Sequence, residues 1–482
     1  MPPKPLVFIP GLPGTVIFDQ TNDVELFPNP LTLTSATMRD QLIRRIAGPD
    51  DDPNAADGVI PKDPVSSLIP GLKSSFIDFS GSFKLADSLY DLLDGLGYST
   101  HPFGNRFQPV GWDWRRPVDG TRALADLKRA ITSLHDATGE KVVILCHSTG
   151  GLVTRALLES QPDLVDLLEQ IIAIAVPWAG TLQPLPYISG QQGFFPLTSG
   201  QTQKALGHSW AAFDLLPPDP GKTDMTDAEG DLDFFTMGGS QASPLTATAW
   251  MPTGPLGNAM AERANRSNDQ FGKRERFLSH DGQPLDVEVV CFGGWGGDTL
   301  TGCAMDARGN LSFATTMEGD GTVARRSALW LSGPRVKHFL VPVGHYPDSQ
   351  ITREHAALWL NPPVRDLLGT LLAGRTRQPY TYAAVDGDDA VNNVPQVKVR
   401  LVAQDADGKP LPGAAVRLFD LQGVDSGTSH PIGNRIRSTL TLSRANITQH
   451  AAGGLFRFEI EFHWQEGGQE KVGPRQALLI QK

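Results

Sequence analysis

One serine of this 482-residue chain stands in a setting that could make its hydroxyl a nucleophile. Ser148 follows the apolar run 142–146 (VVILC) and precedes Thr149 and two glycines. A sharp turn from strand to helix needs small residues on both sides of such a serine, because bulky side chains would collide there. The backbone N–H groups that follow, at a helix N-terminus, could stabilise an oxyanion. The segment therefore predicts a nucleophilic serine; the alternative is a turn that only caps a helix.

A serine hydroxyl is a poor nucleophile without a base, and one histidine is placed as such a base would be. His345 follows the apolar run 339–343 directly, on a loop from which its imidazole could reach Ser148. His338 lies in or before that run, and His355 is expected on a helix. His345 is therefore the predicted base, and the alternative is a histidine of an ordinary surface loop.

An orienting carboxylate should lie between the serine and the histidine in the chain. Asp320 has a glycine on each side, so that its carboxylate could project from a tight turn and fix the imidazole tautomer. Glu318 is the nearby rival. Asp348, three residues after the histidine, is better explained as a turn or helix-cap residue.

Apolar runs alternate with segments of helical periodicity along most of the chain. The runs lie at 6–9, 142–146, 171–176, 287–292 and 339–343. The helical segments include 84–96, 121–136 and 354–372, the last with a pair of prolines inside it. This alternation predicts an α/β fold, with a doubly wound, mostly parallel sheet covered by helices on both faces.

Two regions depart from the alternation. Residues 181–285 form an insertion too long for a structureless loop, which predicts a cap or lid. From residue 379 onward, short alternating strands with turn signals predict an antiparallel β-sandwich-like domain. The predicted domains are thus 1–378, which contains the cap, and 379–482. The second domain could bind a partner, a carbohydrate or a surface, or stabilise the first.

Composition excludes several classes of protein. The net charge of −11 argues against nucleic-acid binding, and 40% hydrophobic residues are enough for a folded core. No apolar stretch approaches the roughly 18 residues of a membrane span. The start shows neither the apolar run nor the cleavage site of a secretory signal. The expectation is a cytoplasmic protein, one exported by a signal-independent route, or an incomplete start.

Neither a metal nor another cofactor is predicted. The acidic stretch 214–233 lacks the ordered spacing of a calcium loop, so a solvated face explains it better. Three cysteines are too few for a disulfide framework, and Cys291 and Cys303 could be bridged or free.

Five motifs, in order, resemble those of the lecithin:cholesterol acyltransferase-like group of α/β-hydrolases, which includes acyltransferases and phospholipases. They are 10–14 (PGLPG), 111–116 (GWDWRR), 147–151 (HSTGG), 176–181 (VPWAGT) and 319–323 (GDGTV) followed by a histidine. The resemblance covers about residues 5–375 and implies an α/β-hydrolase fold with Ser148, Asp320 and His345 as the catalytic triad. It also implies the N–H groups of Leu12 and Thr149 as the oxyanion hole, and a lid within 180–285.

Some positions depart from the group's pattern or have two interpretations. Cys146 replaces the first glycine of the serine motif, and Trp112 replaces a tyrosine. Trp178 could line the acyl site or pack in the core. Phe194 and Phe195 could contact lipid, line the acyl pocket or anchor the cap.

The predicted function is serine-dependent acyl transfer on lipid carboxylic esters through an acyl-enzyme intermediate. Transfer to water would make the protein a lipase, phospholipase or esterase; transfer to an alcohol would make it an O-acyltransferase. The expected partners are a lipid or other ester and, transiently, a membrane or lipid surface at the cap; the oligomeric state is not predicted. The alternatives are amide or peptide hydrolysis on the same triad, an inactive hydrolase-fold binding protein, and a toxin-like phospholipase delivered to other cells.

Overall fold

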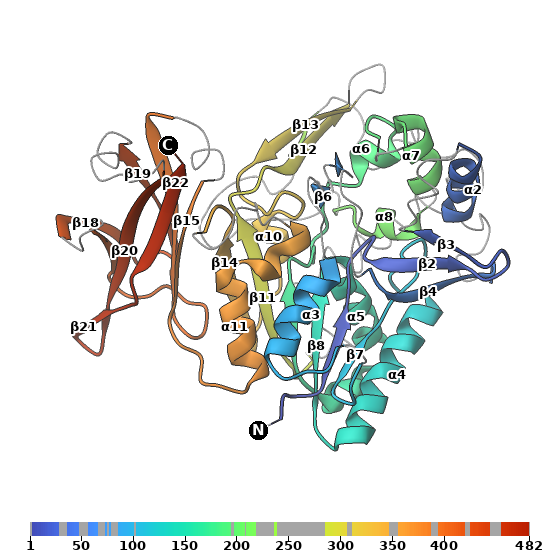
Figure 1. Ribbon diagram of the computed structural model, residues 1–482, viewed down its shortest axis with the longest axis horizontal. Coiled ribbons are helices and arrows are strands. Elements are labelled where there is room, and N and C mark those ends of the chain that lie inside the picture. Colours follow the sequence, from blue (N-terminus) through green and yellow to red (C-terminus); the bar gives the residue numbers. More distant parts are fainter. Residues whose placement is uncertain are drawn as a thin grey trace.

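The computed structural model has a central parallel β-sheet with helices on both faces and a second, all-β part at one side (Figure 1). It describes residues 2–27, 36–47, 56–65, 73–74, 77–78, 85–100, 103–193, 197–207, 209–217, 236–238, 285–305, 311–346, 355–386, 394–419, 425–443 and 455–481.

The central sheet has six parallel strands in the order β14-β11-β9-β8-β1-β7. The strands are β1 (Leu6–Ile9), β7 (Phe107–Pro109), β8 (Val142–His147), β9 (Leu168–Ile174), β11 (Glu288–Trp295) and β14 (Val336–Pro342). The apolar runs of the sequence form all of these strands except β7, so the predicted parallel sheet is confirmed. Strands that are buried on both faces need apolar side chains at successive positions, which explains why the runs do not alternate.

Two helical layers cover this sheet. Helices α4 (Thr121–Thr138) and α5 (Thr149–Ser160) share a hydrophobic core with one face. Helices α3 (Leu85–Gly95) and α11 (Pro362–Leu372) share the core of the other face. Alternate residues of β8 point into the two cores, as the pleat requires. In the described part of the chain, no helix is long and apolar enough to cross a bilayer.

Short helical turns complete the layers. They are η1 (Pro162–Leu167), α10 (Arg325–Ala328) and η3 (His355–Leu360). The segment predicted as one helix at 354–372 is two, η3 and α11, because Asn361 leaves the helical conformation before the two prolines. Proline removes a backbone donor but fits the first turn of a helix, so α11 starts at Pro362.

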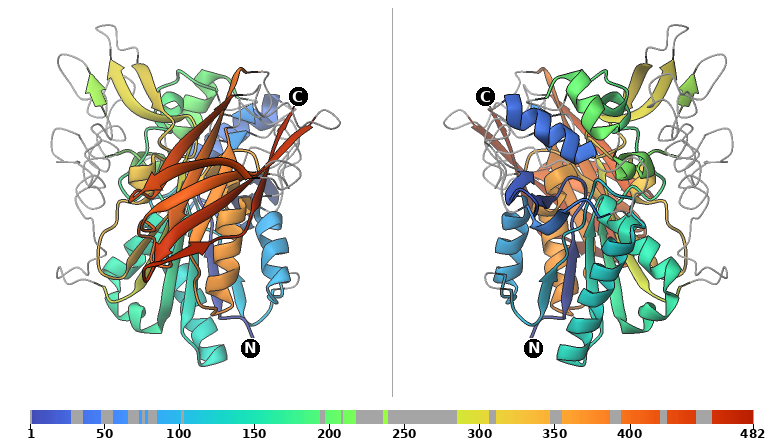
Figure 2. Two further views of the ribbon diagram at one scale, coloured as in Figure 1. Left: turned by 90° about the vertical axis from the view of Figure 1, so that its left-hand side faces the viewer. Right: turned by 90° about the vertical axis from the view of Figure 1, so that its right-hand side faces the viewer.

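A further layer lies beyond the carboxyl ends of the central strands. It contains β2 (Thr15–Asp19), β3 (Val24–Phe27), α2 (Ala36–Ala47), β4 (Val59–Pro64), β5 (Lys73–Ser74), β6 (Ile77–Asp78), α6 (Leu185–Ile188), α7 (Ser199–Leu206), α8 (Trp210–Asp214), β10 (Thr236–Gly238), β12 (Thr299–Met305) and β13 (Leu311–Thr316). Helix α2 packs against α7 (Figures 1 and 2). Helices α6 to α8 fall in the predicted cap, but residues 218–235 and 239–284 lie outside the described part. The cap boundaries therefore stay a prediction.

The C-terminal module, residues 380–481, contains two antiparallel sheets that share one hydrophobic core. Its strands are β15 (Tyr380–Val385), β16 (Gln396–Gln404), β17 (Ala414–Phe419), β18 (Asp425–Gly433), β19 (Arg437–Ser443), β20 (Leu455–Glu466), β21 (Gln469–Val472) and β22 (Gln476–Gln481). One sheet has the order β15-β16-β19, and the other contains β18-β17-β20-β21 with β22 also on β20. The predicted antiparallel β region is confirmed, and it covers the β14 side of the central sheet (Figures 1 and 2).

The close approach of β1 to the first turn of α5 yields a stability prediction. A Cβ at Gly150 would lie 2.5 Å from the carbonyl oxygen of Ile9 and 2.7 Å from that of Pro10. Gly150→Ala should therefore lower the free energy of unfolding by about 1–3 kcal/mol, as overpacked sites do. The measurement is urea denaturation. Gly200→Ala is the matched control: its Cβ in α7 would meet nothing within 4 Å, so we expect a gain of roughly 0.5–1 kcal/mol. A Gly150→Ala protein as stable as the wild type would contradict the packing.

Candidate active site

Ser148 occupies a strained turn between β8 and α5. Its φ of 50° and ψ of −131° put a non-glycine residue at a positive φ, which costs free energy unless the surroundings enforce it. Two hydrogen bonds hold the turn: the Ser148 N–H donates to Ile174 O at 2.9 Å, and the Gly151 N–H donates to Ser148 O at 3.0 Å. The predicted sharp turn from strand to helix is therefore present.

Small residues make this turn possible. A Cβ at Gly151 would lie 2.4 Å from the Val176 side chain, and one at Gly11 would lie 2.5 Å from the Cβ of Ser148. Cys146, which replaces the first glycine of the motif, points instead into the core that α4 and α5 cover, where a side chain fits. Burial raises the pKa of its thiol, which favours the uncharged form. All three cysteines are free and buried, so no bridge joins Cys291 and Cys303.

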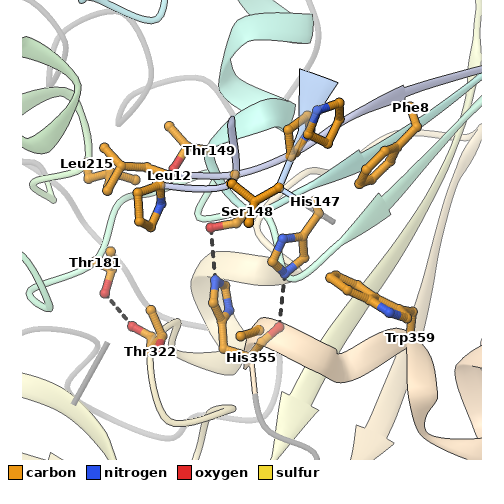
Figure 3. Close-up of a pocket in the computed structure, with 17 residues that line it drawn as sticks. Phe8, Leu12, His147, Ser148, Thr149, Thr181, Leu215, Thr322, His355 and Trp359 are labelled. Carbon is orange, nitrogen blue, oxygen red and sulfur yellow. Dashed lines mark hydrogen bonds between the residues drawn. The ribbon is translucent and has the colours of Figure 1, made fainter. Parts of the chain in front are cut away.

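The imidazole beside Ser148 belongs to His355, the first residue of η3. Its Nε2 lies 2.9 Å from Ser148 Oγ (Figure 3), and its Nδ1 lies 2.9 Å from Asp320 Oδ2. An ionised carboxylate only accepts, so Nδ1 carries the proton and Nε2 is free to accept the serine proton. The serine, imidazole and carboxylate thus form one hydrogen-bonded chain, with each side chain largely or fully buried.

Asp320 is held by its own tight turn. The N–H groups of Thr322 and Val323 donate to its Oδ1 at 3.0 and 2.7 Å, which leaves Oδ2 for the imidazole. The His355 N–H donates to the Asp320 carbonyl oxygen at 3.0 Å, so the two residues are joined through main chain and side chain. Glu318, the rival carboxylate, instead pairs with Arg325 at 3.0 Å.

The prediction that the His345 imidazole reaches Ser148 was wrong, because the His355 imidazole occupies that position. The chain that leaves β14 continues alongside β15, where the His345 N–H donates to Val385 O at 2.8 Å. The Val385 N–H returns a bond to His345 O at 3.2 Å. This pairing places residue 345 at the junction with the C-terminal module, while His355, at the start of the next helical turn, reaches Ser148. Both histidines follow the last strand of the central sheet, so their order in the sequence could not distinguish them.

The loop after β1 lies against the serine turn. The Trp112 indole N–H donates to the Pro10 carbonyl oxygen at 2.8 Å, and the Gly14 N–H donates to Gly11 O at 2.6 Å. These bonds hold Leu12 beside Ser148 (Figure 3). Thr149 is the first residue of α5, so its N–H has no acceptor within the helix. Both residues predicted as oxyanion donors therefore line the cavity at the serine.

This cavity has a volume of about 50 Å³ and is mostly apolar. Its lining includes Phe8, Leu12, Pro13, Val65, Leu215, Ala356 and Trp359, with Thr181 and Thr322 among the polar residues. Trp178 is fully buried in the hydrophobic core and is not among the described residues that line the cavity, which agrees with the second of its two interpretations, packing in the core. Phe194 and Phe195 lie outside the described residues.

His147, which no expectation from the sequence included, holds the main chain of His355. Its Nε2–H donates to the carbonyl oxygen of His355 at 2.9 Å (Figure 3). The His147 ring lies 4.9 Å from that of His355 and 4.8 Å edge-on from that of Trp359. Burial is the main cause that lowers the pKa of His147 to about 3, and the nearby His355 lowers it further. The His147 ring is therefore neutral at ordinary pH. Its position directly before Ser148 was the one feature of the sequence that could have indicated a role for His147 at the site.

The described ranges contain no group of three His, Cys, Asp or Glu side chains that could hold a metal ion. Of the acidic stretch 214–233, only its first four residues are described, and Asp214 accepts a hydrogen bond from the Val118 N–H at 2.9 Å.

Comparisons with known proteins agree with the motifs. Residues 70–241 match the family model for lecithin:cholesterol acyltransferase. The phosphatidylcholine-sterol acyltransferase of Gallus gallus is 27% identical over 136 residues, which are 27% of this chain and 33% of that protein. The lysosomal phospholipase A and acyltransferase of Homo sapiens is 26% identical over 170 residues, which are 32% of this chain and 40% of that protein. The match thus spans a third to two fifths of these relatives, and the predicted resemblance is confirmed.

The chain is also similar, at low sequence identity, to chains in solved structures. A Tle4-Tli4 complex contains a chain with 13% identity and a TM-score of 0.46, and the alignment covers 77% of this chain and 98% of that one. The mature form of Bacillus licheniformis lipase BlEst2 has 10% identity and a TM-score of 0.33, with coverage of 77% and 94%. The α/β-hydrolase fold of this chain follows from its own strand order and serine turn.

The two histidines give a direct test of the site. His355→Gln should abolish labelling of Ser148 by a fluorophosphonate probe, because the serine loses the only imidazole hydrogen-bonded to it in the described structure. His345→Gln is the matched control and should be labelled at close to the wild-type rate. Intact-mass spectrometry follows the adduct. Loss of labelling in His345→Gln with retention in His355→Gln would overturn the assignment.

Burial of a neutral His147 makes stability depend on pH. In the unfolded chain its pKa has the ordinary value of 6.5, and in the folded protein it is about 3. Between these values the unfolded state binds the extra proton, so stability falls as the pH falls through this window. His147→Gln removes the effect. From pH 6.5 to 4.5 the variant should lose less unfolding free energy than the wild type, by up to about 1.4 kcal/mol per pH unit.

Urea denaturation at several pH values measures this difference in slope. His430→Gln, which changes a histidine of β18 in the C-terminal module, is the control and should keep the wild-type slope. Identical slopes for His147→Gln and the wild type would contradict a buried, neutral His147.

Proposed function

We propose that this protein transfers the acyl group of a lipid carboxylic ester, through a covalent ester of Ser148, to water or to a second alcohol. The observation that carries the proposal is the buried chain of hydrogen bonds from Asp320 through His355 to Ser148. An imidazole whose Nδ1–H donates to a carboxylate can take a proton from a serine hydroxyl at Nε2 and later return it.

The first half of the reaction forms the acyl-enzyme. His355 Nε2 takes the proton of Ser148 Oγ as this oxygen bonds to the carbonyl carbon of the ester. Negative charge develops on the carbonyl oxygen, and the N–H groups of Leu12 and Thr149 are the proposed donors to it. As the tetrahedral intermediate collapses, the imidazolium gives its proton to the departing alkoxide. The products of this half are an alcohol and an acyl ester of the serine.

The second half releases the acyl group by the same steps in reverse. Water or an alcohol loses a proton to His355 Nε2 while its oxygen attacks the acyl carbon. The bond to Ser148 Oγ then breaks, and the serine recovers its proton from the imidazolium. Water yields a free fatty acid and an alcohol yields a new ester. The chemistry at the serine is identical in the two cases, so the occupant of the acceptor position decides the product.

A lipid ester as donor is supported by the cavity and by the relatives. The lining at the serine is mainly apolar, which suits an acyl chain better than a peptide. The names of the two relatives, an acyltransferase for phosphatidylcholine and sterol and a lysosomal phospholipase A and acyltransferase, point to phospholipid donors. The family model matches residues 70–241, which include Ser148 but neither Asp320 nor His355. The hydrogen-bonded chain of the three residues is therefore the stronger support for a serine mechanism.

The test is turnover of mixed phospholipid and neutral-lipid vesicles, followed by mass spectrometry of the products with and without an added long-chain alcohol. Ser148→Ala should reduce acyl release by at least about 10³-fold and leave the unfolding midpoint close to that of the wild type. A transferred acyl chain assigns an acyltransferase, and free fatty acid alone assigns a hydrolase. Undiminished turnover in Ser148→Ala, or cleavage of a peptide panel without any lipid turnover, would refute the proposal.

A further inference from the structure

The C-terminal module covers the exposed edge of the central sheet. Strand β14 ends the strand order, so its outer N–H and C=O groups need other partners. The side-chain amide of Gln404, in β16, supplies two of them. The Leu340 N–H donates to Gln404 Oε1 at 2.9 Å, and Gln404 Nε2 donates to His338 O at 2.8 Å. One side chain thus replaces part of a missing strand.

The module also shares a hydrophobic core with the catalytic part. Tyr380 and Val402 are buried in the same cluster as Phe339 and Val343 of the β14 region, and Ile436 packs on this cluster from its periphery. A shared core makes independent movement of the two parts costly, because separation would expose apolar surface. The module is therefore a fixed part of the molecule rather than a tethered one.

The module also contacts the residues that follow β14 and lead toward His355. The buried Arg400 guanidinium donates to Val343 O at 2.9 Å and pairs with Asp386 at 2.5 Å. Two residues later, His345 and Val385 exchange the pair of main-chain hydrogen bonds described above. The chain is thus attached to the module ten residues before His355.

A second line of contacts reaches the turn of the carboxylate. Arg437, in β19, donates to both carboxylate oxygens of Glu318, at 2.6 Å to Oε2. Glu318 lies two residues before Asp320, and its carbonyl oxygen accepts the Arg325 N–H at 2.8 Å, which closes the turn. The Arg437 guanidinium also lies 5.1 Å from the centre of the Trp295 ring at the end of β11.

The Arg437–Glu318 pair is partly buried. The Arg437 side chain is 15% exposed and that of Glu318 is 39% exposed, and one nitrogen, Arg437 Nη1, donates to both oxygens of the carboxylate. Hydrogen bonds between two charged groups are stronger than those between neutral ones. Arg325 holds the same carboxylate from the other side at 3.0 Å. The Glu318 carboxylate is thus fixed between a residue of the module and one of the acid turn itself.

We propose that Arg437 is a positioning residue, and that the C-terminal module acts through it to hold the turn of Asp320 in register with His355. The proposal rests on the proposed function, because register between carboxylate and imidazole matters for proton transfer at Ser148. Arg437 hydrogen-bonds to neither the serine nor the imidazole in the described structure, and the proposed route from it to the turn of Asp320 runs through Glu318. The module is then required for the rate of the chemical step in addition to the stability of the fold.

Arg437→Met in the full chain tests the proposal. We expect kcat on a short-chain ester to fall about 10- to 100-fold, since small misplacements of catalytic groups have effects of this size. KM should change little, because neither Arg437 nor Glu318 lines the cavity at the serine. The acidic limb of the kcat/KM profile should move to lower pH, because a displaced Asp320 stabilises the imidazolium less. Arg437→Lys, which keeps the charge, should recover part of kcat.

Glu318→Gln is the second variant and covers the case in which Arg437→Met does not fold. Its kcat should fall at least as far as that of Arg437→Met, because this change weakens the contacts of the carboxylate with both Arg437 and Arg325. The double variant should lose little more than Glu318→Gln alone, because the Arg437 contact is already removed in that variant. Arg417→Met is the matched control: Arg417 pairs with Glu470 at 3.4 Å on the exposed surface of the same module, and its kcat and pH profile should match the wild type.

The outcomes separate the two proposals. A wild-type protein without ester turnover contradicts the proposed function. An active wild type, with folded Arg437→Met and Glu318→Gln proteins that keep wild-type kcat and pH profiles, contradicts the positioning role, even if their unfolding midpoints fall. A kcat loss in Arg417→Met equal to that in Arg437→Met would also overturn it, since the effect would then be general to the module.

Discussion

The positive φ of Ser148 is the constraint on which the rest of the site depends. A serine in this conformation lifts its hydroxyl off the sheet, but only if neighbouring chains come closer than side chains would allow. Gly11 and Gly150 permit the β1 loop to approach within contact of the turn, and Gly151 lets α5 pass close to Val176. The same approach brings Leu12 to the cavity. The strain of one residue and the two proposed oxyanion donors are thus consequences of one packing arrangement.

A parallel sheet explains how distant residues meet there. Ser148 follows β8, Asp320 lies beyond β11, and His355 lies beyond β14, so all three come from the carboxyl edge of neighbouring or nearby strands. Burial then determines how the histidines behave. His147 stays neutral because desolvation lowers its pKa, and it donates a hydrogen bond to the main chain of His355. The neighbouring imidazole therefore adds no competing charge beside the one that would take the serine proton.

The same edge of the sheet explains the C-terminal module. An uncovered β14 would leave unpaired backbone groups next to the segments that carry the acid and the imidazole. Gln404 and Arg400 satisfy groups along this edge, and Arg437 reaches Glu318 beside the acid turn. One set of contacts thus covers an edge strand and also reaches the segments that lead to Asp320 and His355, which links the stability of the fold to the geometry of the site.

Much of this molecule could be predicted from the sequence because the relevant signals are local. Apolar runs without alternation indicated buried parallel strands, small residues around Ser148 indicated a sharp turn, and glycines around Asp320 indicated a projecting carboxylate. Which imidazole lies beside Ser148 was not a local property of the sequence. His345 and His355 both follow the last strand, and the choice depends on β15 pairing with residue 345, which commits that histidine to the module. The sequence determined the fold and the residues at two of the three positions, whereas long-range strand pairing decided which imidazole reaches the serine.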